Sequence, residues 1–273
     1  MASEQRIEPA DILASIYGDG IIGAKDAFDS ALLAQAGEDV EVLLREALAR
    51  PGGAVSRGPE RYYVEIHPER LRGFVEIVTH PWFVAVCEAV LGPRYEIIEV
   101  GFDVPGPGAQ DQPWHRDFPA TAEATERRRL DSLAFNLTTV DVTEDMGPLE
   151  IAPGTQWDDP SAFEHGMFPP KFLWGRYEAR AQRKLPKAGD ISARTALTIH
   201  RGTANRSRLP RPALVVGVDA PGAGHSAWHD LQITHAFAET LPPSLLSHLP
   251  ARRVHALEPI VQAHQIDGLV TAA

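Results

Sequence analysis

The sequence has little cysteine, an excess of acidic over basic residues and no long apolar run. Cys87 is the only cysteine among 273 residues, which excludes a disulfide within the chain and a zinc site built from several thiolates. No apolar segment approaches the roughly 18 residues that a membrane helix needs. Lys and Arg number 26 against 37 Asp and Glu, giving a formal net charge of −11. A field of this sign disfavours binding to nucleic acid or to an anionic membrane.

The chain also lacks features that would divide it or direct it elsewhere. Residues 1–7 are polar and contain no apolar signal core, so we expect a cytoplasmic protein. A length of 273 residues is compatible with one or two domains, and no linker, repeat or low-complexity tract marks a boundary. We therefore expect a single domain over 1–273. It would comprise a mostly helical layer over 1–93, a β core over 94–220 and a helical or extended segment over 221–273.

The hydrophobic pattern changes from helical to extended near residue 94. Residues 8–50 place apolar side chains at helical spacing, and the segments 68–78 and 81–91 each open with a proline, which suits a first helical turn. Short β-branched and apolar runs predict strands over 62–66, 95–104, 132–140, 195–199 and 213–218. Residues 233–249 predict a helix that is broken at Pro242-Pro243. Short strands with frequent turn signals favour a mainly β sandwich or barrel with flanking helices.

A possible metal site begins with the segment Pro113-Trp114-His115-Arg116-Asp117. On an extended strand, residues i and i+2 face the same side, so His115 and Asp117 can reach one cation. An isolated His-x-Asp pair is weak evidence in a chain with 11 histidines. His200 strengthens it, because this residue ends an apolar run and precedes a glycine turn. A third ligand there would complete the two-histidine, one-carboxylate face that is typical of non-haem Fe(II) oxygenases.

Arg211 is the candidate anion-binding residue of the same site. It lies eleven residues after His200 and directly before the predicted strand 213–218. If that strand runs back beside the one ending at His200, the guanidinium enters the same cavity. A guanidinium fork can hold a carboxylate through two parallel hydrogen bonds. Three other arginines compete for this role, namely Arg201, Arg206 and Arg208.

Taken together, these motifs resemble the phytanoyl-CoA dioxygenase family of Fe(II)/2-oxoglutarate oxygenases over about residues 95–220. The family's His-x-Asp motif matches His115 and Asp117, and its distal histidine with an arginine eleven residues on matches His200 and Arg211. The intermediate Gly-Pro-Leu and Pro-Gly-Ser-His signature, and the Asn-x-Ser that follows the distal histidine, resemble Gly147-Pro148-Leu149, Pro153-Gly154-Thr155-Gln156, Asn205 and Ser207.

Two positions depart from the pattern of this family. Thr155-Gln156 stands in place of the usual Ser-His, a change that we expect to alter the part of the site that contacts the substrate. Gly202 stands where many members have a serine that touches 2-oxoglutarate, and Thr203 is a candidate for replacing that hydrogen bond.

The resemblance implies a double-stranded β-helix, that is, a cupin-like jelly roll within the α+β class. It implies that His115, Asp117 and His200 bind Fe(II), and that Arg211 binds the far carboxylate of the cosubstrate 2-oxoglutarate. Gln112 and Asn136 are further candidate contacts for the cosubstrate's carboxylates. The reaction would consume O2, release succinate and CO2, and oxidise a small molecule, with a role in secondary-metabolite biosynthesis.

The outcome on the substrate would be hydroxylation, desaturation, epoxidation or ring closure. Halogenation is disfavoured, because related halogenases lack the carboxylate that Asp117 provides. The oxidative outcome, the substrate itself and whether it is tethered to a carrier are open.

Several other sequence features have competing interpretations. His225 and His229 are spaced i, i+4 and could share a metal on a helix, and His67-Pro68-Glu69 is a second His-x-acid pair. Residues 127–129 are three arginines, which form either a solvated surface or a clamp for an acidic substrate. The aromatic-rich segment 156–186 either lines the substrate pocket or covers the barrel. From it and the metal motif we take Trp157 and Phe118 as candidate substrate contacts.

Two further functions are compatible with the same motifs. A cupin-like metal enzyme that does not use 2-oxoglutarate would need the three ligands but not Arg211. A non-catalytic barrel could bind a ligand without chemistry, although such a protein would have no reason to retain all three ligands. The oligomeric state is open, with the N-terminal helices as a candidate dimer surface.

Overall fold

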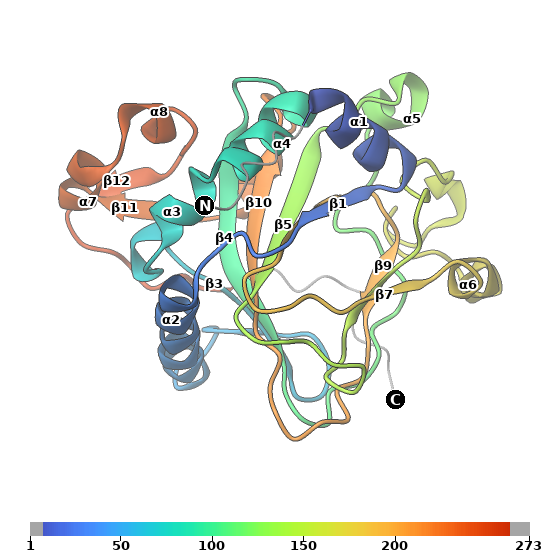
Figure 1. Cartoon of the computed structure of the whole chain (residues 1–273), viewed down its shortest axis with the longest axis horizontal. Coiled ribbons are helices and arrows are strands. Elements are labelled where there is room, and N and C mark those ends of the chain that lie inside the picture. The colour runs from blue at the N-terminus through green and yellow to red at the C-terminus, as the bar shows by residue number, and fades with distance from the viewer. Residues whose placement is uncertain (1–7, 263–273) are drawn as a thin grey trace.

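Two antiparallel sheets form the centre of the molecule in the computed structural model, which describes residues 8–262 (Figure 1). The expectations for residues 1–7 and 263–273 lie outside the described residues. The major sheet has seven strands in the order β1-β8-β5-β10-β4-β3-β2, and the minor sheet has three in the order β7-β6-β9. The strands are β1 Ile21–Ala24, β2 Val55–Ser56, β3 Arg61–Glu65, β4 Glu96–Pro105, β5 Ser132–Thr138, β6 Leu149–Ile151, β7 Gln182–Lys184, β8 Ile191–Thr195, β9 His200–Gly202 and β10 Ala213–Asp219.

Helices flank these sheets, and the C-terminal elements form a separate corner of the molecule (Figure 1). The helices are α1 Pro9–Gly18, α2 Ser30–Leu48, α3 Phe74–Val78, α4 Pro81–Leu91, α5 Ala122–Arg127, α6 Lys171–Glu178, α7 His235–Thr240 and α8 Pro243–Leu246. Strands β11 Gln232–Thr234 and β12 Arg252–Val254 pair in parallel in that corner. Two sheets with flanking helices confirm the predicted fold class.

The main core lies between the helices and one face of the major sheet. Helix α4 starts at Pro81, and the ring of the preceding His80 accepts a hydrogen bond from the Trp82 amide at 3.2 Å. Its buried side chains pack on β5, where the rings of Phe83 and Phe135 lie 4.0 Å apart. This packing removes a large apolar area from water, which is the main stabilising contribution to such a core.

The opposite face of the major sheet lines a cavity. Side chains on a strand alternate between its two faces. In β5, Phe135 faces the helices whereas Asn136 lines the cavity. Likewise Ala193 of β8 is in the core and its neighbour Arg194 lines the cavity. The fold therefore presents polar side chains from several strands to one cavity.

Some predicted elements differ from those in the structure. The helical region 8–50 is interrupted by β1, which pairs with β8 at the edge of the major sheet. The segment 68–78 is a short 3-10 turn followed by α3, because Gly73 adopts φ 81° between them. Residues 233–249 contain the end of β11 and two short helices. Strands β1, β2 and β3 join the major sheet, so residues 1–93 contribute strands as well as helices, and the expectation of a single domain stays a prediction.

The prediction of a strand over 195–199 is wrong, and the difference affects the position of His200. Strand β8 ends at Thr195, whose hydroxyl accepts hydrogen bonds from the amides of Leu197 and Thr198 at 3.2 and 3.1 Å. A side chain that satisfies nearby backbone groups in this way competes with strand pairing. The chain therefore turns, and β9 begins at His200 in the minor sheet.

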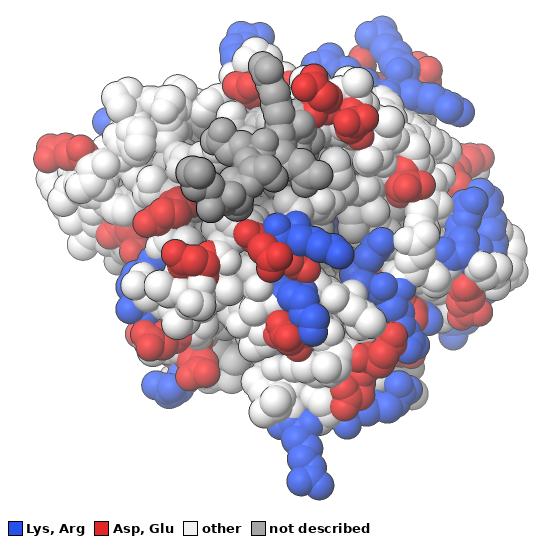
Figure 2. Space-filling view, in the orientation of Figure 1, with Lys and Arg blue, Asp and Glu red and all other residues white. Residues whose placement is uncertain are grey.

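Neither acidic nor basic side chains form a continuous patch on the face of the molecule shown in Figure 2. Figure 2 shows acidic and basic side chains interspersed on this face. Among residues 8–262, no helix is both long enough and apolar enough to cross a bilayer.

We expect Phe135→Ala to lower the free energy of unfolding by about 3–5 kcal/mol, because it leaves a cavity beneath α4. The Phe135 side chain is 1% exposed. Phe172 is 79% exposed, so Phe172→Ala is the matched control and should change stability by less than about 0.5 kcal/mol. Urea unfolding of the three proteins, followed by tryptophan fluorescence, tests this. Equal stability of the two variants would contradict the described packing.

Candidate metal centre

Three side chains that could bind a metal meet at one end of the cavity. Ligand atoms of His115, Asp117 and His200 all lie within 4.8 Å of one another. The His115 segment pairs with β9, because the amides of His115 and His200 each donate to the other residue's carbonyl at 3.0 Å. The imidazole rings of these two residues are 4.3 Å apart. The structure therefore brings together all three ligands expected from the sequence.

Hydrogen bonds fix the orientation of both imidazoles. The Nδ1 of His115 lies 2.8 Å from the Pro113 carbonyl, and the Nδ1 of His200 lies 2.9 Å from the Thr198 carbonyl. Because a carbonyl only accepts, each Nδ1 carries the proton and each Nε2 keeps its lone pair. Burial lowers the pKa of His115 to about 4 and holds the pKa of His200 well below its ordinary value. Both rings are neutral at pH 7, which is the form that binds a metal.

Asp117 is held as a carboxylate by an ion pair with Arg194 of β8. The guanidinium contacts both carboxylate oxygens, with Nη2 3.2 Å from Oδ1. Burial raises the pKa of the Asp117 carboxyl, but the charge and hydrogen bonds of Arg194, together with the two neighbouring histidines, outweigh this effect and keep the pKa below its ordinary range. Two neutral imidazoles and one carboxylate oxygen are the donor set that suits non-haem Fe(II). The residues present therefore fit this metal.

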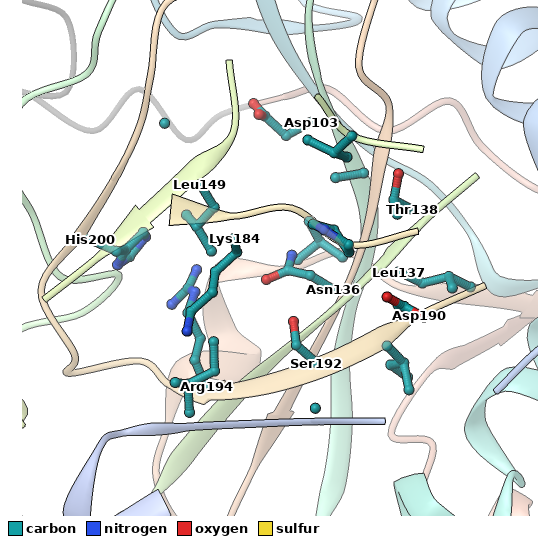
Figure 3. Close-up of a pocket in the computed structure, with 18 of the residues that line it drawn as sticks. Asp103, Asn136, Leu137, Thr138, Leu149, Lys184, Asp190, Ser192, Arg194 and His200 are labelled. Atoms are coloured by element: carbon teal, nitrogen blue, oxygen red, sulfur yellow. The ribbon is translucent and has the colours of Figure 1, made fainter. Parts of the chain in front are cut away.

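The cavity beside this cluster is large enough for small molecules. Its volume is about 450 Å³, and both sheets contribute to its wall. Figure 3 shows His200 on one side, with Asn136 and Ser192 projecting from the major sheet and Lys184 from β7. Basic side chains are common in this wall although the chain as a whole is acidic.

Arg211 enters the cavity by a different route from the one expected. Strand β10 pairs with β4 and β5 in the major sheet, whereas His200 belongs to the minor sheet. The two segments are therefore not neighbours, and Arg211 reaches the cavity from the opposite wall. Within residues 8–262, its buried Nε has no hydrogen-bond partner, and its Nη2 lies 3.9 Å from Asp103 Oδ2, beyond hydrogen-bond distance. Burial lowers the pKa of Arg211 to about 10, so it is cationic at neutral pH.

The other predicted cosubstrate contacts differ in where they lie. Gln112 and Asn136 both line the cavity. The Gln112 carbonyl oxygen accepts hydrogen bonds from the Gly202 amide at 3.0 Å and from Arg61 Nη1 at 2.7 Å. Thr203 does not line the cavity, because its hydroxyl donates to the Pro148 carbonyl at 2.7 Å. Its side chain is thus not available to replace the serine hydroxyl that many family members have at the position of Gly202.

Neither candidate substrate contact lines the cavity. The Trp157 ring nitrogen donates to the Tyr17 carbonyl at 3.0 Å, beneath α1. Phe118 stacks on His225 with ring centroids 3.9 Å apart. From the segment 156–186, residues 182–186 line the cavity instead.

The competing metal and anion candidates have other partners. His225 pairs with Asp219 at 3.1 Å, and His229 pairs with Glu65 at 3.3 Å. Within the described part of the chain, neither belongs to a group of three potential ligands. Arg201 donates to Glu150 at 2.8 Å. Of the arginines at 127–129, the first pairs with Glu123 on the exposed surface, which fits a solvated face.

Three charged residues of the cavity wall were not predicted from the sequence. Arg61, Asp103 and Arg194 all line it and come from β3, β4 and β8. Each is a charged residue in a strand that also contributes buried side chains. A charged residue in such a strand can indicate a polar cavity. It does not indicate which charges it will contact, because those residues lie far away in the sequence.

Comparison with known proteins identifies relatives in sequence and structure. The model of the phytanoyl-CoA dioxygenase (PhyH) family matches residues 16–213. "Dioxygenase andF" of Emericella variicolor is 25% identical in an alignment of 198 residues that covers 68% of this chain and 58% of that protein. The chain thus spans little more than half the length of this relative.

Two solved structures share the fold at low sequence identity. EctD from S. alaskensis, crystallised with 2-oxoglutarate and 5-hydroxyectoine, has a TM-score of 0.64 and 18% identity, covering 93% of this chain and 90% of that one. The epimerase SnoN, in complex with Fe3+, alpha ketoglutarate and nogalamycin RO, has a TM-score of 0.63 and 19% identity, covering 96% and 99%. These likenesses support the jelly-roll fold.

We expect Co(II), an oxygen-stable substitute for Fe(II), to raise the thermal unfolding temperature of the metal-free protein. An ion that binds only the folded state adds about 2.7 kcal/mol at a free concentration of 100 times its Kd. His200→Ala should abolish this shift. His225→Ala is the matched control and should retain it, because His225 pairs with Asp219 outside the cluster. A shift that survives in His200→Ala and disappears in His225→Ala would reverse the assignment.

Proposed function

The chain belongs to the phytanoyl-CoA dioxygenase family, and we propose that it is a non-haem Fe(II)- and 2-oxoglutarate-dependent dioxygenase acting on a small molecule. The observation that carries this proposal is a buried arginine with unused donors, Arg211, in the cavity that also holds a ligand cluster suited to iron. A metal site alone fits many enzymes. A metal site facing a guanidinium with unused hydrogen-bond donors fits a metal-binding carboxylic acid with a second carboxylate.

His115, Asp117 and His200 would hold the metal. Three ligands on one face leave coordination positions open for the cosubstrate and O2. When bound, Fe(II) supplies the activation of O2 that couples conversion of 2-oxoglutarate into succinate and CO2 to oxidation of the substrate. The protein's own contribution is to fix the two imidazoles through their Nδ1 hydrogen bonds and to keep the Asp117 carboxylate ionised.

Arg211 would bind the far carboxylate of 2-oxoglutarate. Charge-assisted hydrogen bonds from a guanidinium fork to a carboxylate are among the stronger polar contacts in proteins. Gln112 and Asn136 line the same cavity and have amide groups that could donate to the cosubstrate's carboxylates. The Gln112 carbonyl is already engaged by Gly202 and Arg61, which orients its amide nitrogen.

The substrate would be a small metabolite. A cavity of about 450 Å³ suits a small molecule rather than a polymer. We propose hydroxylation, desaturation, epoxidation or ring closure within secondary metabolism, in line with a relative named as a dioxygenase and a fold neighbour from nogalamycin biosynthesis. The cytoplasmic location stays a prediction.

A cupin-like enzyme that does not use 2-oxoglutarate is the competing function. It would need the metal ligands only. It gives no reason for burying the Arg211 guanidinium without a hydrogen-bond acceptor among the described residues. Burying a guanidinium whose hydrogen-bond donors are unsatisfied is costly, so the arrangement favours an enzyme that fills this position with an anion.

We expect 2-oxoglutarate, added without oxygen to the Fe(II)-loaded protein, to produce the weak visible absorption band of a chelate. Arg211→Met should raise the Kd for 2-oxoglutarate about 10- to 100-fold, because it removes charged hydrogen bonds to the far carboxylate. Arg206 is exposed and outside the cavity wall, so Arg206→Met is the matched control and should bind like the wild type. Iron binding without any band would favour the competing function.

A further inference from the structure

Gly202 leaves a space in the cavity wall that another side chain fills. A Cβ built on this residue would overlap Arg61 Nη1 and would lie 2.6 Å from Arg61 Cζ and 2.7 Å from Gln112 Oε1. Real Cβ atoms do not approach other atoms so closely, and neither neighbour is free to move, because both are buried and hydrogen-bonded to each other. The glycine is therefore a steric requirement for the position of Arg61.

Arg61 is held rigidly in this space. Its side chain is 1% exposed. Nη1 donates to Gln112 Oε1 at 2.7 Å and Nη2 donates to the Thr203 carbonyl at 2.8 Å. These two bonds use two of the five N–H donors of a guanidinium, and the buried Nε has no partner among the described residues. Arg61 thus retains donors while lining the cavity.

Arg61 and Arg211 share one acidic neighbour. Asp103 Oδ2 lies 3.8 Å from Arg61 Nη1 and 3.9 Å from Arg211 Nη2. These distances exceed those of hydrogen bonds. The other oxygen of this carboxylate, Oδ1, is buried and has no partner within residues 8–262. Both guanidiniums are therefore close to Asp103 without being saturated by it.

The local charge is unbalanced by one positive unit. Arg61 and Arg211 contribute two positive charges, and Asp103 contributes one negative charge. The next charges that act on Arg61 are Arg57 and Asp111, which have opposite signs. A buried excess charge is unfavourable unless a partner neutralises it. One additional carboxylate would balance this group.

We propose that Arg61 is a second anchor for the far carboxylate of 2-oxoglutarate, placed in the space that Gly202 leaves open. This inference rests on the proposed function. The carboxylate would be received between two guanidiniums, and a guanidinium of β3 would take the place of a serine hydroxyl on β9. The pair of arginines would make the site selective for 2-oxo acids that carry a second carboxylate.

The test compares two ligands that differ only in that carboxylate. The wild type, Arg61→Met and the control Arg206→Met are loaded with Fe(II) without oxygen. Each is titrated with 2-oxoglutarate and with 2-oxopentanoate, the five-carbon 2-oxo acid that lacks the second carboxylate. The visible band reports the Kd of both ligands, and their ratio measures the preference for the second carboxylate.

We expect Arg61→Met to reduce this preference about 10-fold or more, chiefly by weakening 2-oxoglutarate binding. The control should retain the wild-type ratio. A purely structural role for Arg61 would weaken both ligands alike, so an unchanged ratio would overturn this inference alone. A wild type that binds neither ligand would overturn the proposed function, and this inference with it.

Three further variants test the shared space and cover the case in which Arg61→Met does not fold. Arg61→Lys keeps the charge but loses the fork, and it should have a ratio between those of the wild type and Arg61→Met. In Arg61→Ala, Gln112 Oε1 loses its guanidinium donor and can move away from position 202. The added Gly202→Ser change then no longer meets a guanidinium and restores a hydroxyl donor. This double variant should bind 2-oxoglutarate more tightly than Arg61→Ala. Equal or weaker binding would contradict the exchange of serine for arginine.

Discussion

The reciprocal backbone hydrogen bonds between His115 and His200, both 3.0 Å long, are the constraint on which the site depends. They attach the segment after β4 to β9 and set two imidazoles side by side. The alternation of an extended chain then puts Asp117 on the same side as His115. The Nδ1 hydrogen bonds to Pro113 and Thr198 fix the rings. The donor set is therefore assembled by backbone pairing and by the hydrogen bonds of the two rings.

The cavity concentrates positive charge within an acidic protein. The formal net charge is −11, yet Arg61, Arg194 and Arg211 are buried in one wall. Each is placed by the polar face of the major sheet, whose other face packs against helices. Arg194 is neutralised by Asp117, whereas Arg61 and Arg211 share Asp103. Arg194 therefore supports a metal ligand, whereas Arg61 and Arg211 keep hydrogen-bond donors that can bind an anion.

The residue at position 202 determines which side chain from another strand can enter the cavity wall. Glycine at 202 removes a side chain from β9 and allows a guanidinium from β3 to enter. Gln112 joins the two, because its carbonyl oxygen accepts from both Gly202 and Arg61. Thr203, although adjacent in sequence, turns its hydroxyl toward Pro148. Adjacent positions on a strand face opposite sides, which is why the neighbouring hydroxyl does not replace the missing one.

The sequence by itself determined the features that depend on short-range spacing. The His-x-Asp pair, the distal His200 and Arg211, the helix 81–91 and the strands near 95–104, 132–140 and 213–218 follow from local periodicity and motif order, and the structure has these elements at or close to these positions. The tertiary structure alone decided which wall each residue joins. Because the chain turns at Thr195, His200 lies in the minor sheet. Arg61 packs against Gly202. Trp157 and Phe118 pack outside the cavity, against Tyr17 and His225. Contacts between residues this far apart depend on how the two sheets pack together, which local pattern does not encode.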